Sequence, residues 1–206
     1  MNHEPLYRHL VTTLNRELRA DSNGRTGFCI LASATLLEVL DHLQIAAQPL
    51  RVEAVVYPPP DHPSEHYPCA LGSDGDGTRR PAAKPDMWHG HLAVLTHDNF
   101  LLDATLDQVN EGNPWLDARP FVATVPLDFG IVWFGLDRDH TTWHPLESWQ
   151  TPWPDTRVRY LAFPGRGGFK SAPDWRPSHR RELVATLLRA TTGPLDGLYA
   201  RMSSDV

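Results

Sequence analysis

The fold is decided by the stretch Trp88-His-Gly-His-Leu-Ala-Val-Leu-Thr-His-Asp-Asn-Phe-Leu-Leu-Asp-Ala-Thr105. Its two halves are rich in strand-forming residues, and three loop residues, His97-Asp98-Asn99, lie between them. Asn99 is a residue type that tolerates the left-handed backbone conformation such loops require. The stretch therefore predicts a β-hairpin.

The loop length fixes which side chains of this hairpin meet. A three-residue loop pairs Thr96 with Phe100, and it places Asp103 opposite Ala93. Asp103 then shares a face with His91 and lies diagonal to it, within reach of contact. A two-residue loop would turn Asp103 to the other face. The prediction of a His–Asp pair therefore depends on a loop of three residues.

A His–Asp pair has a use in nucleophilic catalysis. The carboxylate fixes one imidazole tautomer and leaves the second ring nitrogen to accept a thiol proton. Pairing alone does not choose the members, because His89 shares the face of His91 and Asp107 shares that of Asp103.

A thiol lies upstream, at Cys29. The broad apolar face from Phe28 or Cys29 to about Leu43 predicts a helix, which Thr26 could cap. A thiol in the first turn feels the positive end of the helix dipole, which favours the thiolate. The backbone N–H groups of that turn can also bind an oxyanion. Position alone does not decide the role, because a Cys followed by Ile-Leu-Ala is also typical of a core residue.

The rest of the chain predicts an α+β fold in one domain over residues 1–206. Residues 4–20 form an amphipathic helix, and residues 58–87 form a long Pro/Gly-rich loop that could act as a lid. Helices come first and an antiparallel set of strands follows. The further expected elements are strands at 51–57, 88–96, 100–105, 120–125, 130–135 and 157–163, and a final helix from Ser178 to about Ala190.

Composition narrows the class of protein. The net charge of −6 argues against nucleic acid as the partner, because duplex binding needs a basic face. The N-terminus lacks a signal-peptide layout, and no apolar run is long enough to span a membrane, so we expect a cytoplasmic protein. Phosphate-loop and dinucleotide motifs are absent, and no cofactor is expected.

The order of these pieces resembles the transglutaminase-like superfamily of papain-related cysteine enzymes. The residues that carry the resemblance, within about residues 24–107, are Gly27-Phe-Cys29 opening a helix, Leu43-Gln-Ile-Ala-Ala-Gln before strand Leu50–Val56, His91-Leu-Ala-Val-Leu, and Leu101-Leu-Asp103-Ala-Thr105. The chain departs from the family at Ala93, where an aromatic residue is common, and only Asn23 is a candidate for the upstream oxyanion residue.

The resemblance implies a catalytic triad of Cys29, His91 and Asp103 on a papain-like core. In that core, N-terminal helices pack on an antiparallel sheet, with a C-terminal helix. It implies acyl transfer through a Cys29 thioester, with a peptide, protein, small amide or amine as substrate. Water would make the chain a peptidase, amidase or deamidase, and an amine would make it a transamidase. Arylamine N-acetyltransferases use a similar triad with a coenzyme A thioester, so that branch stays open.

Two other readings compete with a thiol enzyme. In the first, His89 and His91 bind a metal ion, completed by Asp103 or Asp107, and Cys29 is structural.

In the second, the fold is a catalytically inactive binding module. Trp143, Trp149 and Trp153 would then form a partner surface.

Overall fold

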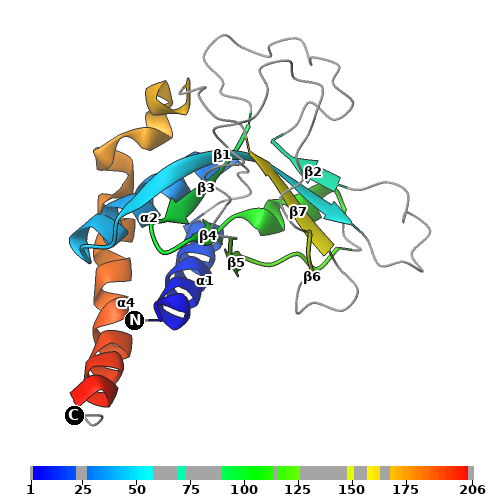
Figure 1. Ribbon diagram of the computed structural model, residues 1–206. Helices are drawn as coiled ribbons and strands as arrows, with labels where there is room; N and C mark the ends of the chain where they lie inside the picture. The colour runs from blue at the N-terminus through cyan, green and yellow to red at the C-terminus, as the bar shows by residue number, and fades with distance from the viewer. Residues whose placement is uncertain are drawn as a thin grey trace.

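In the computed structural model, helices pack on an antiparallel sheet that curls (Figure 1). The predicted α+β class, with helices on an antiparallel sheet, is confirmed, and the curl was not predicted. Several sequence expectations fall outside the described residues: the strand at 130–135, Asn23, Thr26, His89, Trp143 and Trp153. The described residues are 2–21, 27–57, 69–72, 90–113, 116–125, 148–150, 157–162 and 168–203.

The sheet is built around one long strand. Its order is β5-β4-β3-β1-β7-β6, every pair is antiparallel, and β2 pairs with β1 off this path. β1 pairs with β3 in its first half and with β7 and β2 in its second half. The strands are β1 (Ala47–Tyr57), β2 (Cys69–Leu71), β3 (His91–Thr96), β4 (Phe100–Asp103), β5 (Phe121–Thr124), β6 (Ser148–Gln150) and β7 (Arg157–Ala162).

The β3–β4 hairpin has the predicted register. Val94 pairs with Leu102 and Leu95 with Leu101, which leaves three residues in the loop. Asn99 has φ of 64°, the left-handed conformation expected of it. The prediction that His91 and Asp103 share a face is thereby confirmed.

Two apolar cores lie on opposite faces of the sheet. Alternate residues of β1 point into the curl of the sheet, and their neighbours point outward. The core inside the curl includes Leu50, Val52, Ala54, Val56, Ala93, Leu101, Phe121, Val158 and Tyr160. The core between the sheet and the helices includes Leu10, Leu14, Leu36, Leu40, Val94, Leu102, Val122, Val184 and Leu187.

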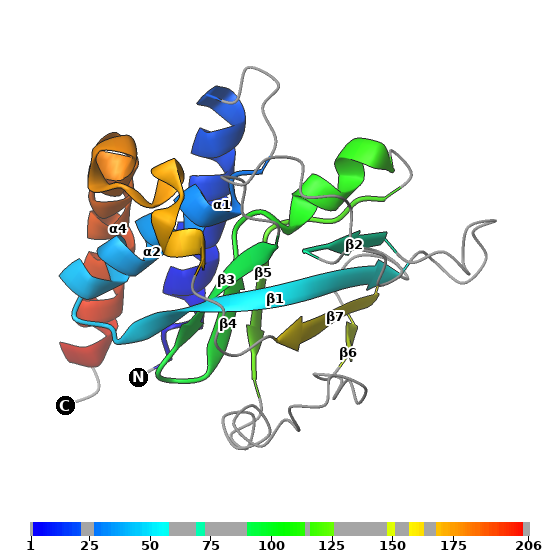
Figure 2. The same cartoon turned by 90° about the horizontal axis from the view of Figure 1, so that it is seen from above.

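Three α-helices lie together on one side of the sheet (Figure 2). They are α1 (Glu4–Asp21), α2 (Cys29–His42) and α4 (Pro177–Ser203). Three 3₁₀ helices, η1 (Leu106–Gly112), η2 (Gly168–Ser171) and η3 (Pro173–Trp175), complete the described elements. The first two predicted helices are confirmed. The segment 58–87, predicted as a loop, contains the short strand β2, which pairs with the end of β1.

The last helix is longer than predicted. It continues past Ala190 through Gly193 and Pro194, although Gly and Pro are residue types that often end a helix. Pro194 has no N–H to donate to the carbonyl of Ala190, four residues earlier. His9 Nε2, on α1, lies 3.1 Å from that carbonyl oxygen and replaces the missing donor. A contact between helices therefore overrides the local signal.

Helix α1 is attached to the loop end of the hairpin. The Asp98 carboxylate accepts a hydrogen bond of 2.9 Å from the Tyr7 hydroxyl and one of 2.5 Å from Thr96 Oγ1. His3 Nδ1 lies 2.9 Å from its other oxygen. The three partners hold the pKa of Asp98 below its ordinary value, although burial opposes them.

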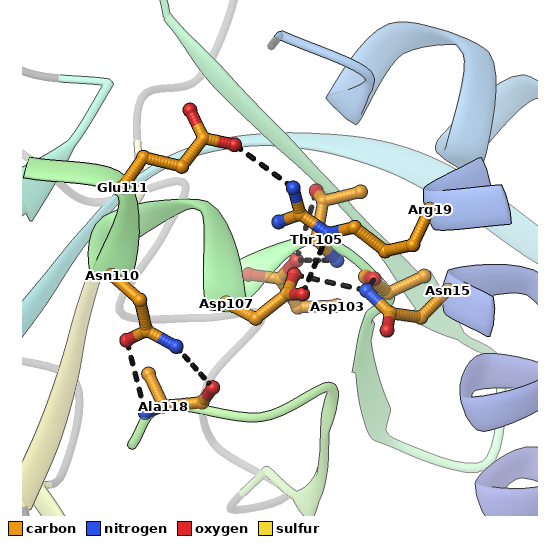
Figure 3. A network of polar contacts seen from close by, with 9 residues as sticks. Asn15, Arg19, Asp103, Thr105, Asp107, Asn110, Glu111 and Ala118 are labelled. Atoms are coloured by element: carbon orange, nitrogen blue, oxygen red, sulfur yellow. Dashed lines mark hydrogen bonds and ion pairs between the residues drawn. The ribbon is translucent and has the colours of Figure 1, made fainter. Parts of the chain in front are cut away.

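Helix α1 is attached to the open end of the hairpin as well, as Figure 3 shows. Asn15 Nδ2 donates to the carbonyl of Ala104 and to Asp107, both at 2.9 Å. Arg19 Nε donates to Asp107 at 2.9 Å, and Arg19 Nη1 to Glu111 at 2.9 Å. The helix thus fixes both ends of the hairpin.

We expect Asp98→Ala to lower the free energy of unfolding by about 1–3 kcal/mol, because it removes the acceptor of the buried Tyr7 hydroxyl. Asp117 is the matched control, since its described ion pair is with the exposed Arg119. Asp117→Ala should cost about 0.5 kcal/mol or less. Urea unfolding of both variants measures the difference, and equal losses would contradict the role given to Asp98.

Candidate active site

Asp103 is fully buried at the end of β4. One of its oxygens, Oδ2, lies 2.6 Å from His91 Nε2 and accepts a hydrogen bond of 2.9 Å from the Tyr160 hydroxyl. The other, Oδ1, accepts the Thr105 N–H at 2.9 Å and the Thr105 hydroxyl at 3.4 Å. Burial disfavours the charged carboxylate, but His91 and these donors outweigh it and lower the pKa of Asp103.

His91 is also fully buried, at the first residue of β3. Burial alone would lower the pKa of its imidazole. The charge and hydrogen bond of Asp103 oppose that effect, and the interaction with Cys29 adds to them. Together they raise the pKa of His91 from 6.5 to about 10. Since Nε2 faces Asp103, Nδ1 is the nitrogen left for Cys29.

Cys29 is the first residue of α2 and is 5 % exposed. Its Sγ lies 3.8 Å from the carbonyl oxygen of Gly90, to which the thiol donates. The N-cap residue is Phe28, and no side chain of the described residues makes a capping hydrogen bond there. Thr26, the expected cap, lies outside the described residues. The first turn of any α-helix has backbone N–H groups without an acceptor inside the helix, and here that turn begins at Cys29.

The helix that carries Cys29 is fixed to the strand that carries His91. Ser33 Oγ donates to the carbonyl of Leu92 at 3.0 Å. Leu92 also packs with Cys29 and Ile30 in a small apolar cluster that includes Phe169 of η2. This cluster sets the thiol beside the imidazole, and it also covers the sulfur.

Gly72, which sequence reasoning did not single out, supports His91 from behind. Its φ is +84°, a conformation that side chains other than glycine rarely adopt. A Cβ on Gly72 would lie 2.4 Å from the His91 backbone nitrogen and 2.6 Å from the Val52 oxygen. Only glycine fits here, because the backbone at position 72 lies directly against both β1 and β3. The sequence does not reveal this role, because Gly72 is one of several glycines in its segment and neither its φ nor its contact with His91 can be predicted from them.

The two ambiguities of the sequence have different outcomes. Asp107 lies in η1 and bonds to Asn15 and Arg19, so Asp103 is the carboxylate beside His91. His89 lies outside the described residues. Within the described ranges, no group of three or more His, Cys, Asp or Glu side chains could hold a metal ion.

Tyr160 is the other residue that sequence reasoning missed. It lies on β7, 57 residues from Asp103, and meets it only because the sheet curls. Tyr160 pairs with Ala54 of β1, and nothing in the sequence near Tyr160 indicates a contact with Asp103.

Comparison of the chain with protein-family models, with curated proteins and with solved structures finds no match. Among the described helices, none combines the length and apolar character needed to cross a membrane.

We expect Gly72→Ala to lower the free energy of unfolding more than Gly27→Ala does. Both glycines have positive φ, but a Cβ at Gly27 would meet nothing within 4 Å beyond its chain neighbours. Gly27→Ala should cost about 1–2 kcal/mol for the backbone conformation alone. Gly72→Ala adds about 1–3 kcal/mol of overpacking against His91. Thermal unfolding of the two variants tests this, and equal losses would show that Gly72 does not constrain β3.

Proposed function

We propose that this chain is a thiol-dependent acyl-transfer enzyme with Cys29 as nucleophile, His91 as acid–base and Asp103 as its orienting carboxylate. The observation that carries the proposal is the contact of 2.6 Å between His91 Nε2 and the buried Asp103 carboxylate, which leaves the other ring nitrogen for Cys29 at the start of α2. The raised pKa of His91 agrees with this arrangement. An imidazole with a pKa of about 10 is charged at neutral pH. In thiol enzymes generally, a charged imidazole beside the nucleophile favours the reactive thiolate form.

The reaction would act on an amide or peptide carbonyl. The Cys29 thiolate adds to the carbonyl carbon, and the backbone N–H groups of the first turn of α2 are the donors available to the oxyanion. Collapse of the adduct breaks the C–N bond, and the imidazolium of His91 gives its proton to the leaving amine. A thioester on Cys29 remains. Water or a second amine then gives a proton to His91 and adds to the thioester. Breakage of the C–S bond releases the acyl group and restores the thiolate and the imidazolium.

We extend this proposal to the fold: the core is of the papain-related, transglutaminase-like kind. The support is the order of the elements, with a thiol opening a helix, then a His strand and an adjacent Asp strand. The hairpin register and the contact between His91 and Asp103 agree with that order.

The chain contains its own control for thiol reactivity. Burial raises the pKa of Cys69, so its thiolate should be scarce until the pH is alkaline. Cys29 lies beside the His91 imidazole instead, and the interaction between the two side chains raises the pKa of His91. We expect iodoacetamide, a small reagent, to alkylate Cys29 faster than Cys69 at neutral pH, as peptide mass spectrometry over a pH series would show.

Asp103→Asn keeps the size of the side chain and removes its charge. The pKa of His91 should then fall, because its largest favourable partner is the Asp103 charge. Alkylation of Cys29 at neutral pH should slow by about tenfold or more, since the imidazole beside the sulfur is then less often charged. Cys69 should be unaffected. Slow and equal labelling of both thiols in the unmodified chain would defeat the thiol-enzyme proposal and favour an inactive binding module.

A second experiment traps the acyl enzyme. With p-nitrophenyl acetate, the thiolate should expel p-nitrophenolate in a burst and carry the acetyl group as a thioester. We expect the acetyl group on the peptide that contains Cys29, and its release by hydroxylamine. Cys69→Ala should retain the burst and Cys29→Ala should lose it. Acetylation that persists in Cys29→Ala would mean that another group is the nucleophile.

A further inference from the structure

The Tyr160 hydroxyl occupies the same Asp103 oxygen that faces His91. Oδ2 is 2.9 Å from the hydroxyl and 2.6 Å from His91 Nε2. The position of Oδ2 sets the orientation of the His91 imidazole. The hydrogen bond from Tyr160 restrains this oxygen from a second direction. Tyr160 is fully buried, and burial raises its pKa well above the ordinary value, so the hydroxyl remains a donor.

Tyr160 is itself fixed from two sides. Its backbone pairs with Ala54 of β1, the strand that also pairs with His91 through Val52. Its ring stacks on Phe121 with centroids 5.7 Å apart and planes at 22°. Phe121 in turn pairs directly with Asp103, across β5 and β4. The hydroxyl therefore approaches the carboxylate along a path set by strands on both sides of the curl.

We propose that Tyr160 is a positioning residue for the reaction, which keeps Asp103 ionised and aimed at His91. This inference rests on the proposed function. A buried carboxylate that loses a donor gains affinity for a proton. A protonated Asp103 no longer stabilises the imidazolium, and the thiolate of Cys29 loses its counter-ion.

Three of the described residues contact the Asp103 carboxylate. His91 on β3 and Tyr160 on β7 are titratable and lower its pKa, and Thr105 donates from its N–H and hydroxyl. Cys29 acts on Asp103 through His91. A change at Tyr160 therefore reaches the thiol through one carboxylate.

The test is Tyr160→Phe, which removes the hydroxyl and keeps the ring that stacks on Phe121. The readout is the rate of Cys29 alkylation by iodoacetamide as a function of pH. Loss of a hydrogen bond to a charged group should move the acid limb of this profile upward by about 1–2 pH units. The burst with p-nitrophenyl acetate should slow in parallel.

Tyr7→Phe is the matched control. It also removes a hydroxyl from a buried tyrosine that donates to an aspartate, at the same distance of 2.9 Å, but at the hairpin loop. Both variants should lose stability, and only Tyr160→Phe should shift the pH profile. An unshifted profile in a folded Tyr160→Phe, or an equal shift in Tyr7→Phe, would overturn the positioning role. Failure of the proposed function looks different, because the unmodified chain would then show no preference for Cys29 over Cys69.

Discussion

The buried carboxylate of Asp103 constrains the strands around it. A carboxylate removed from water is costly unless donors surround it. Its donors come from His91 on β3, Tyr160 on β7 and Thr105 in the following turn. The strands β4 and β7 lie at separate places in the sheet order, so only a curled sheet lets Tyr160 reach Asp103. The curl and the charge therefore depend on each other.

Polar contacts fix the β3–β4 hairpin, which carries His91 and Asp103, at both of its ends. Helix α1 fixes the loop end of the hairpin through Asp98 and the open end through Asp107. A slip of one residue in the hairpin would break both attachments and turn Asp103 away from His91. Register is thus enforced at two places about one hairpin length apart. Gly72 adds a third constraint at the backbone of His91.

The parts of the site that sequence could predict are local. The register follows from three loop residues and one left-handed Asn99, and the start of α2 follows from a short pattern around Cys29. Tyr160 and Gly72 could not be predicted, because their roles arise from contacts between distant strands. The final helix was predicted too short for a similar reason. His9 supplies the hydrogen bond that Pro194 cannot, and α1 is far from Pro194 in sequence.

The charges that would drive catalysis also contribute to stability, with opposite pH limits. The pKa of His91 is raised by folding, so its contribution is present in full below 6.5 and is lost as the pH rises through about 10. The pKa of Asp103 is lowered, so its contribution is present above 3.8 and is lost as the pH falls through the lowered pKa. Between these limits the imidazolium lies between two anions when Cys29 is a thiolate. The apolar cluster around Cys29 excludes water, which would otherwise screen these charges. Burial is typical of an inert core cysteine, but here it also strengthens the interaction with His91 that would make the thiol reactive.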